Sequence, residues 1–287
     1  MTSKTRTAPN LLAIVLISLS PFALTAQYQD KLTQDKQAIE SLLASKHLDS
    51  LPGDPKTFYS RGHAVRAAAL QKLIANCEKF YEAQFPKRAF SVPLYVLDKN
   101  DWNERLFGAP YALPNYLPTN NLIVIGAEKN ALARLSGQPD DPVTSDTIIS
   151  GYDYVAVHEL GHYFFITLNH VRTREHWVDE FLANYFLICY AKGNGLDLPF
   201  SELPRNPPHK TLEDFERLYD KVGPSNYDWY QKEFIRYGLK LYPQFKVELI
   251  RKVIDNYSTI GKRVDAAALL KSLSRDTMDT WLKEMKE

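Results

Sequence analysis

One predominantly apolar stretch carries three ionisable side chains at helical spacing, and this combination constrains the fold more than any other feature. Residues 147–168 contain the pentapeptide HELGH at positions 158–162. Residues four apart lie on one face of a helix, so the imidazoles of His158 and His162 can reach one cation, with Glu159 beside them. Burying three such groups costs free energy unless they are paired or bind a metal. The pattern therefore predicts a buried helix that holds a metal ion.

The residue types indicate Zn²⁺. Imidazole nitrogen is a preferred zinc ligand, and Glu159 is placed to act as the general base for a metal-bound water. A catalytic zinc needs a third protein ligand, and candidates lie on the next predicted helix, in residues 176–184. The alternative interpretation is that two hydrogen-bonded core histidines and a paired carboxylate share this spacing by chance.

The surroundings of HELGH resemble those of a known enzyme family. Seventeen residues separate His162 from Glu180, which lies in the segment WVDEFLA. This arrangement resembles the gluzincin metallopeptidases, and the segment is similar to the W-x-x-E-x-x-A sequence of the alanyl-aminopeptidase type within the thermolysin-like group. The resemblance covers residues 155–191. It implies that His158, His162 and Glu180 bind zinc and that Glu159 is the base.

The resemblance also implies supporting residues. Asn184, one helical turn after Glu180, occupies the place where thermolysin-like enzymes keep an aspartate that orients the first histidine ligand. Gluzincins commonly donate a hydrogen bond to the oxyanion from a tyrosine or histidine on a later helix. Residues 226–237 resemble that helix, with Tyr227 as the first candidate donor and Tyr230 as the second.

Some alternatives stay open at this point. Asp179, His176 and His170 are rivals of Glu180 for the third ligand position. No segment similar to Gly-Ala-Met-Glu-Asn precedes HELGH, so an endopeptidase or carboxypeptidase is favoured over an aminopeptidase. Residues 121–127 lie where gluzincins place an edge strand that pairs with an extended substrate. The connection 107–121, which is rich in Pro and Tyr, is a candidate wall of the substrate cleft.

The order of the predicted elements indicates the fold class. Apolar spacing predicts helices over 65–85, 147–168, 176–191, 211–222, 227–241, 246–256 and 264–286, and strands over 92–97 and 122–127. Strands precede most helices and do not alternate with them. We therefore expect an α+β fold, with a small mixed sheet lobe that includes an edge strand, a mainly helical lobe, and a zincin-like active-site helix in the cleft between them.

The N-terminus reads as a secretory signal. Lys4 and Arg6 precede an uncharged apolar run over 11–24 that is shorter than a membrane span, and we expect cleavage after Ala26. An uncleaved anchor is the alternative. The predicted organisation is a signal peptide over 1–26, a leader helix and linker over 27–60, and the catalytic domain over 61–287. Cys77 and Cys189 could form one disulfide or stay buried and free.

The net charge of the chain excludes one class of function. The chain has 35 Lys and Arg against 34 Asp and Glu, a net charge of +1, so it lacks the basic field that nucleic-acid binding requires. The sequence predicts a secreted or periplasmic zinc metallopeptidase that acts on peptides or proteins, with no stable membrane insertion after signal cleavage. The alternative is a zinc-bound, catalytically inert module that binds peptide or glycan.

Overall fold

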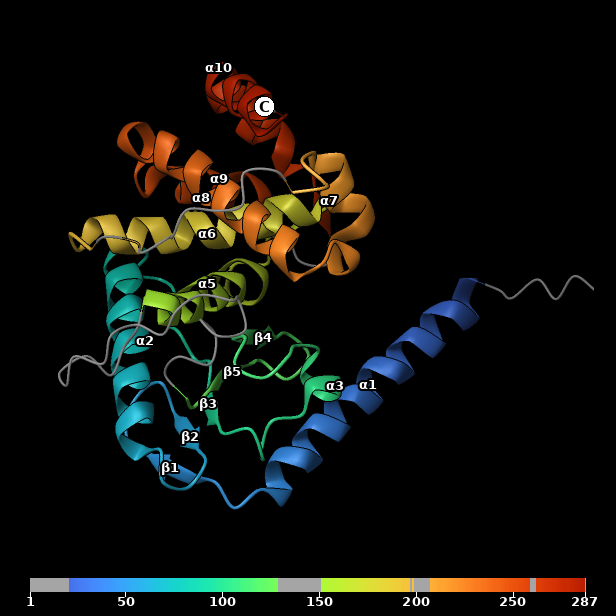
Figure 1. Cartoon of the computed structure of the whole chain (residues 1–287), viewed down its shortest axis with the longest axis vertical. Helices are drawn as coiled ribbons and strands as arrows, with labels where there is room; N and C mark the ends of the chain where they lie inside the picture. The colour runs from blue at the N-terminus through green and yellow to red at the C-terminus, as the bar shows by residue number, and fades with distance from the viewer. Residues whose placement is uncertain (1–20, 129–150, 197, 199–206, 259–261, 287) are drawn as a thin grey trace, which may run out of the picture.

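The computed structural model describes residues 21–128, 151–196, 198, 207–258 and 262–286. It combines a small mixed sheet with a larger helical part, so the predicted α+β class is confirmed at this level. In Figure 1, α5 (Val155–His162) lies between the sheet below it and α6 (His176–Gly193) above it. The helix that carries HELGH is therefore enclosed on two sides.

The main sheet has five strands in the order β1-β2-β3-β5-β4. Pairing is parallel between β2 and β3 and between β3 and β5, and antiparallel at both edges. The strands are β1 (Asp49–Leu51), β2 (Thr57–Tyr59), β3 (Leu94–Leu97), β4 (Asn115–Leu117) and β5 (Leu122–Gly126). A second sheet of two short strands joins β6 (Arg172–Thr173) to β7 (Arg263–Val264).

Two of the five main strands coincide with the predicted ones, but the edge strand does not. β3 and β5 fall within 92–97 and 122–127 as expected. However, β5 is internal, flanked by β3 and β4, so residues 121–127 do not form the edge. The edge strand next to β5 is β4, inside the connection 107–121. With only three residues, bordered by Pro114 and Pro118, it shows no period-2 pattern that sequence analysis could detect.

Most helices agree closely with the apolar periodicity, but α3 was not predicted, and residues 147–150 of one predicted helix lie outside the described residues. Those of the sheet lobe are α1 (Pro21–Ser45), α2 (Ala64–Gln84) and α3 (Glu104–Phe107), and a short η1 (Gly151–Tyr154) leads into α5. α5 continues as the π-helix η2 (Tyr163–Leu168). The helical lobe contains α6, α7 (Leu212–Leu218), η3 (Tyr219–Lys221), α8 (Pro224–Phe245), α9 (Glu248–Tyr257) and α10 (Ala266–Lys286).

The segment assigned to a leader and linker, 27–60, is part of the folded body. β1 and β2 belong to the main sheet, and Ile39 and Leu43 of α1 are buried in a small core with Trp102 and Phe107 on one face of that sheet. α1 runs through the expected cleavage position after Ala26, and residues 1–20 lie outside the described part of the chain. Among the described helices, none is long and apolar enough to cross a membrane.

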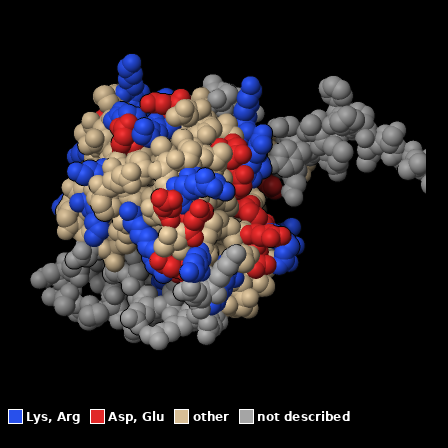
Figure 2. All heavy atoms as spheres, turned by 90° about the horizontal axis from the view of Figure 1, so that it is seen from above, with Lys and Arg blue, Asp and Glu red and all other residues tan. Residues whose placement is uncertain are grey.

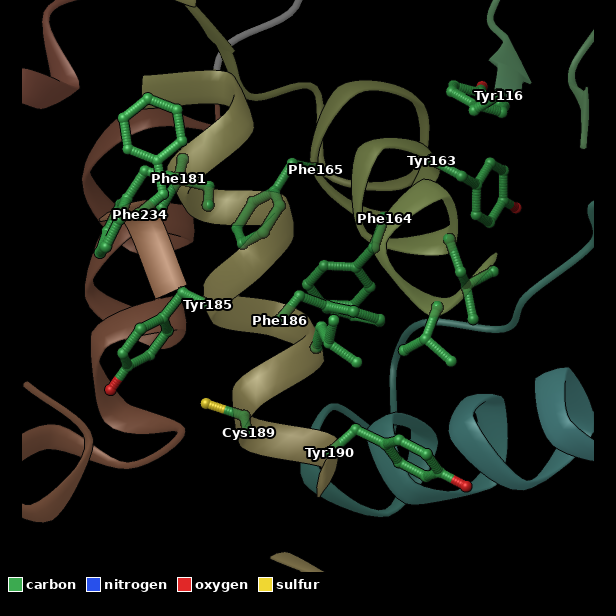
Figure 3. Packing of buried hydrophobic residues seen from close by; sticks show 14 of the residues in the cluster. Tyr116, Tyr163, Phe164, Phe165, Phe181, Tyr185, Phe186, Cys189, Tyr190 and Phe234 are labelled. Carbon is green, nitrogen blue, oxygen red and sulfur yellow. The ribbon is translucent and has the colours of Figure 1, made fainter. Parts of the chain in front are cut away.

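The large core lies on the other face of the sheet and is rich in aromatic rings. Tyr81 of α2 stacks on Phe186 of α6 with ring centroids 3.7 Å apart, and Phe164 of η2 lies 5.1 Å from the same Phe186 ring. Figure 3 shows Phe164, Phe165 and Phe186 pointing toward one another between η2 and α6. Offset and edge contacts of this kind add to the stabilisation from apolar burial. This core holds α5 and α6 against each other.

Cys77 and Cys189, whose pairing the sequence did not decide, are both free and buried. Burial raises the pKa of each thiol above its ordinary value. Both side chains therefore act as small apolar core residues and not as nucleophiles.

The surface mixes both signs of charge. Figure 2 shows Lys and Arg side chains interspersed with Asp and Glu on the face seen from above. On α8 and α10, for example, Lys240 lies 2.6 Å from Glu284, and Arg236 lies 3.4 Å from the same carboxylate.

Glu78 provides a stability test that is independent of function. It is buried in α2 with one carboxylate oxygen that lacks a hydrogen-bond partner, and burial, with Asp54 and Glu82 nearby, raises its pKa from 4.5 to about 8. The unfolded chain releases this proton near pH 4.5, so the free energy of unfolding falls between pH 4.5 and 8, by about 3 kcal/mol at pH 7.

We therefore expect Glu78→Gln to match wild type closely in urea unfolding at pH 4.5 and to be more stable than wild type by about 4 kcal/mol at pH 8. Taking the difference between the two proteins at each pH cancels the titration of all other groups. Exposed Glu40→Gln is the control and should track wild type throughout. A Glu78→Gln advantage that does not grow with pH would contradict the raised pKa.

Candidate metal centre

A glycine lets the two site-bearing helices approach closely. A Cβ at Gly161, in the middle of HELGH, would lie 3.0 Å from the Cα of Ala183 and 3.2 Å from its carbonyl oxygen in α6. Any side chain at this position would push the helices apart. The distance between α5 and α6, and with it the reach from one helix to the other, depends on Gly161.

Three of the predicted ligands converge across this contact. The Nε2 atoms of His158 and His162 lie 3.0 Å apart, and Oε2 of Glu180 lies 3.3 Å from the first and 3.7 Å from the second. Zinc bonds of 2.0–2.1 Å in tetrahedral geometry place ligand atoms about 3.3 Å apart. Two imidazole nitrogens and one carboxylate oxygen at these separations fit a single Zn²⁺.

Glu159 completes a compact group with the two histidines. Ligand atoms of His158, Glu159 and His162 all lie within 4.8 Å of one another. Oε2 of Glu159 accepts a hydrogen bond of 2.7 Å from the backbone N–H of Tyr116, in edge strand β4. The Tyr116 hydroxyl also bonds to Thr167 of η2, at 2.5 Å. The edge strand is thus attached to the HELGH helix and its continuation at two points.

Charge inside the cluster is strongly coupled. Burial disfavours the charged form of Glu180, but His162 and His158 outweigh it and hold the pKa of this carboxyl well below its usual range. Burial likewise opposes protonation of His162, yet the Glu180 carboxylate prevails and raises the pKa of His162 to about 9. Burial also raises the pKa of Glu159. Without a metal, His162 and Glu180 therefore form a buried ion pair at neutral pH.

Side chains from α6, η3 and α8 fix Glu180. Its Oε1 accepts from the hydroxyl of Tyr219 at 2.9 Å, and its Oε2 accepts from Nε2 of Gln231 at 2.8 Å. Asn184 donates to Oε1 of Gln231 at 2.6 Å and to the backbone oxygen of Glu180 at 2.9 Å. The amide of Asn184 thus supports Glu180 through Gln231, whereas the family pattern places this residue beside the first histidine.

The structure separates the two predicted tyrosines. The ring of Tyr227 lies 6.4 Å from that of Tyr219, whose hydroxyl bonds to Glu180. Burial and the charge of Glu180 raise the pKa of Tyr227 well above its ordinary value. The hydroxyl of Tyr230 instead donates to the backbone oxygen of Thr211 at 2.8 Å, at the start of α7. Tyr230 is fully buried, so its hydroxyl serves the packing of α7 on α8 and is directed away from the predicted site.

Tyr219 is a site residue that sequence reasoning missed. The Glu180 carboxylate and burial raise the pKa of its phenol, and its ring stacks on His176 with centroids 4.4 Å apart. Its backbone has φ of 23°, where non-glycine residues are strained. The sequence offered only a tyrosine inside a predicted helix. Gln231 gave no signal either, because its role depends on the packing of α8 on α6.

The rival third ligands have other partners. Oδ1 of Asp179 accepts hydrogen bonds from the backbone N–H and the hydroxyl of Thr173, at 3.3 and 2.9 Å. His176 stacks on Tyr219, and His170 is exposed on a turn with positive φ. Within the part of the chain that the structure describes, the metal-ligand geometry therefore favours Glu180.

A buried ion pair anchors the start of the HELGH helix. Nη1 of Arg66, in the first turn of α2, donates to Oδ2 of Asp153 at 2.7 Å, and Nη2 contacts Oδ1. Asp153 lies in η1, which runs directly into α5. Both side chains are buried, so this two-point contact fixes the N-terminal end of the HELGH helix.

Comparison of the chain with protein-family models, with curated proteins and with solved structures gives no match. The features of this chain that point to a function are therefore the site itself and the resemblance carried by HELGH and Glu180.

Proposed function

We propose that this chain is a zinc-dependent metallopeptidase of the gluzincin type. The observation that carries the proposal is the convergence of His158, His162 and Glu180 from two packed helices at 3.0–3.7 Å, with Glu159 beside them. The placement of α5 between a small sheet and a helical lobe supports a zincin-like fold. The expected location, outside the cytoplasm after signal cleavage, is part of the proposal and is consistent with the apolar N-terminal run.

His158, His162 and Glu180 would hold the ion, which when bound supplies a water of lowered pKa and polarises the substrate carbonyl. Glu159 would act as the general base and then as the general acid: it would take a proton from the attacking water and deliver it to the leaving amine. The N–H of Tyr116 holds one oxygen of Glu159 and so orients the carboxylate. Tyr219 and Gln231 orient Glu180 in the same way.

The rival function is a zinc-bound module that binds peptide or glycan without reaction. A purely structural zinc site normally closes its fourth position with a protein ligand, and it needs no base. Glu159 is buried beside the two histidines and is oriented by a main-chain donor, which suits a general base. We therefore favour the enzyme.

The proposal is tested by metal content and peptide digestion together. The purified protein should bind one zinc per chain and cleave members of a peptide library, and a chelator should abolish cleavage that added zinc restores. Zinc binding without cleavage of any peptide would favour the inert module. A protein that binds no zinc after reconstitution would contradict both.

Zinc affinity should depend on pH through His162. Its pKa of about 9 in the metal-free protein means that it carries a proton at neutral pH, which zinc must displace. The zinc association constant should thus fall about tenfold for each pH unit below 9, and the effect disappears above that pH. Competition titrations with a chelator of known affinity, between pH 6 and 8, measure this slope. A zinc affinity that is independent of pH over this range would contradict the His162–Glu180 ion pair.

Tyr227 is the proposed donor to the oxyanion. Tyr227→Phe removes one hydroxyl and leaves the ring, so we expect kcat to fall by roughly 10²–10³ with little change in KM or zinc content. Tyr230→Phe is the matched control from the same helix, since its hydroxyl donates to Thr211, and it should leave kcat near wild type. If Tyr227→Phe keeps full activity, Tyr219→Phe is the next variant, because its hydroxyl lies 2.9 Å from Glu180.

A further inference from the structure

One edge of the main sheet, which no other described strand pairs with, borders the proposed site. β4 is the edge strand, and its Tyr116 N–H bonds to Glu159 at 2.7 Å. An extended peptide that binds to such an edge is normally held by a ladder of main-chain hydrogen bonds in both directions. The number of main-chain donors and acceptors that β4 presents therefore limits how a substrate can bind.

The pairing of β4 determines which of its groups face outward. Tyr116 is opposite Ile123 in β5, but the N–H of Ile123 donates to Pro93 on the β3 side at 3.0 Å. Tyr116 and Ile123 are thus a non-hydrogen-bonded pair, and the N–H and C=O of Tyr116 both face away from the sheet. Outward positions alternate along a strand, so residues 114 and 118 are its neighbours on this edge.

Both neighbouring outward positions are proline. Pro114 and Pro118 have no N–H, so the edge has one main-chain donor, that of Tyr116, and Glu159 engages it. The outward carbonyl of Tyr116 receives no hydrogen bond from the described residues. This edge therefore presents acceptors and no free donor. Proline at an edge also hinders the addition of another strand.

We infer, building on the proposed function, that the enzyme recognises only a short stretch of its peptide substrate, so that cleavage does not depend on peptide length. A substrate donates one N–H to the carbonyl of Tyr116 and is not added to the sheet as a further strand. Residues of a longer polypeptide beyond this contact find no main-chain donors on β4, so they add little to binding.

The test uses peptides of three to ten residues that share one cleaved bond, taken from the library digestion. With zinc-loaded wild type, kcat/KM should change less than about threefold across the series, because each additional hydrogen bond would be worth about fivefold. A rise of tenfold or more with length would overturn the inference while leaving the metallopeptidase intact. Absence of cleavage of every peptide would contradict the proposed function and, with it, this inference.

Proline variants give the complementary result. Pro114→Ala and Pro118→Ala each add an outward N–H, so kcat/KM for the ten-residue peptide should rise about fivefold while that for the tripeptide stays unchanged. Pro110→Ala, in the same connection but outside β4, is the control and should affect neither substrate. Zinc content and circular dichroism confirm that each variant is folded. If both variants fold and neither favours the long peptide, the missing donors do not limit substrate length.

Discussion

Glu159→Gln is expected to retain zinc and to lower kcat by roughly 10²–10⁴, the usual contribution of a general acid–base residue. Gln is nearly isosteric with Glu, and its side-chain oxygen can still accept the hydrogen bond from Tyr116 that Glu159 accepts at 2.7 Å. The side chain therefore keeps its place but cannot take a proton from water at neutral pH. Steady-state kinetics with a cleaved peptide and metal analysis of the same sample measure both quantities.

A surface variant separates this effect from a general loss of stability. Glu248→Gln lies in α9 on the exposed surface, where its partner is Arg251, and it should match wild type in kcat and in zinc content. Wild-type turnover by Glu159→Gln would remove the general base from the mechanism. Loss of zinc from Glu159→Gln would instead mean that this carboxylate is a ligand.

Glu180→Ala should weaken zinc binding by more than about 100-fold, because it removes one of the three metal ligands and not merely a residue that orients a ligand. It also leaves the hydroxyl of Tyr219 and the amide of Gln231 without their carboxylate acceptor. We expect the metal-free protein to lose about 1–3 kcal/mol of stability as a result. Zinc competition titrations and chemical unfolding without metal measure the two effects separately.

Asp179→Ala is the matched control, since it removes a carboxylate from the neighbouring position of the same helix. The Asp179 carboxylate accepts hydrogen bonds from Thr173, so zinc affinity should stay within about tenfold of wild type, below the roughly 10–100-fold loss typical of a residue that orients a ligand. Normal zinc binding by Glu180→Ala together with zinc loss in Asp179→Ala would reverse the assignment of the third ligand.

The elements that the sequence predicted are those with enough residues to show a periodic pattern. Apart from the four-residue α3, the helices from α2 onward repeat apolar residues at helical spacing, and β3 and β5 are short apolar runs between turn residues. β1, β2 and β4 have three residues each, too few to show alternation. Strands of that length form because a neighbouring strand supplies their hydrogen bonds. The residues that determine such a strand therefore lie elsewhere in the chain.

The candidate site also contains residues that one helix places and residues that only tertiary packing places. The spacing of His158, Glu159 and His162 is a property of one helix, so the sequence by itself determined that these groups share a face. The position of Glu180 opposite them followed from a family pattern. Only the tertiary structure decided that Tyr219 and Gln231 bond to Glu180 and that Tyr116 bonds to Glu159.

The physical reason is the range of the interactions. A helix converts sequence separation into direction through bonds within one segment, so residues four apart are placed without knowledge of the rest of the chain. The hydroxyl of Tyr230 turns toward Thr211, and that of Tyr219 toward Glu180, because of how α7, η3 and α8 pack on α6. The sequence thus determined which residues stand on the HELGH face, and the packing of distant helices and of one edge strand decided which side chains complete the site.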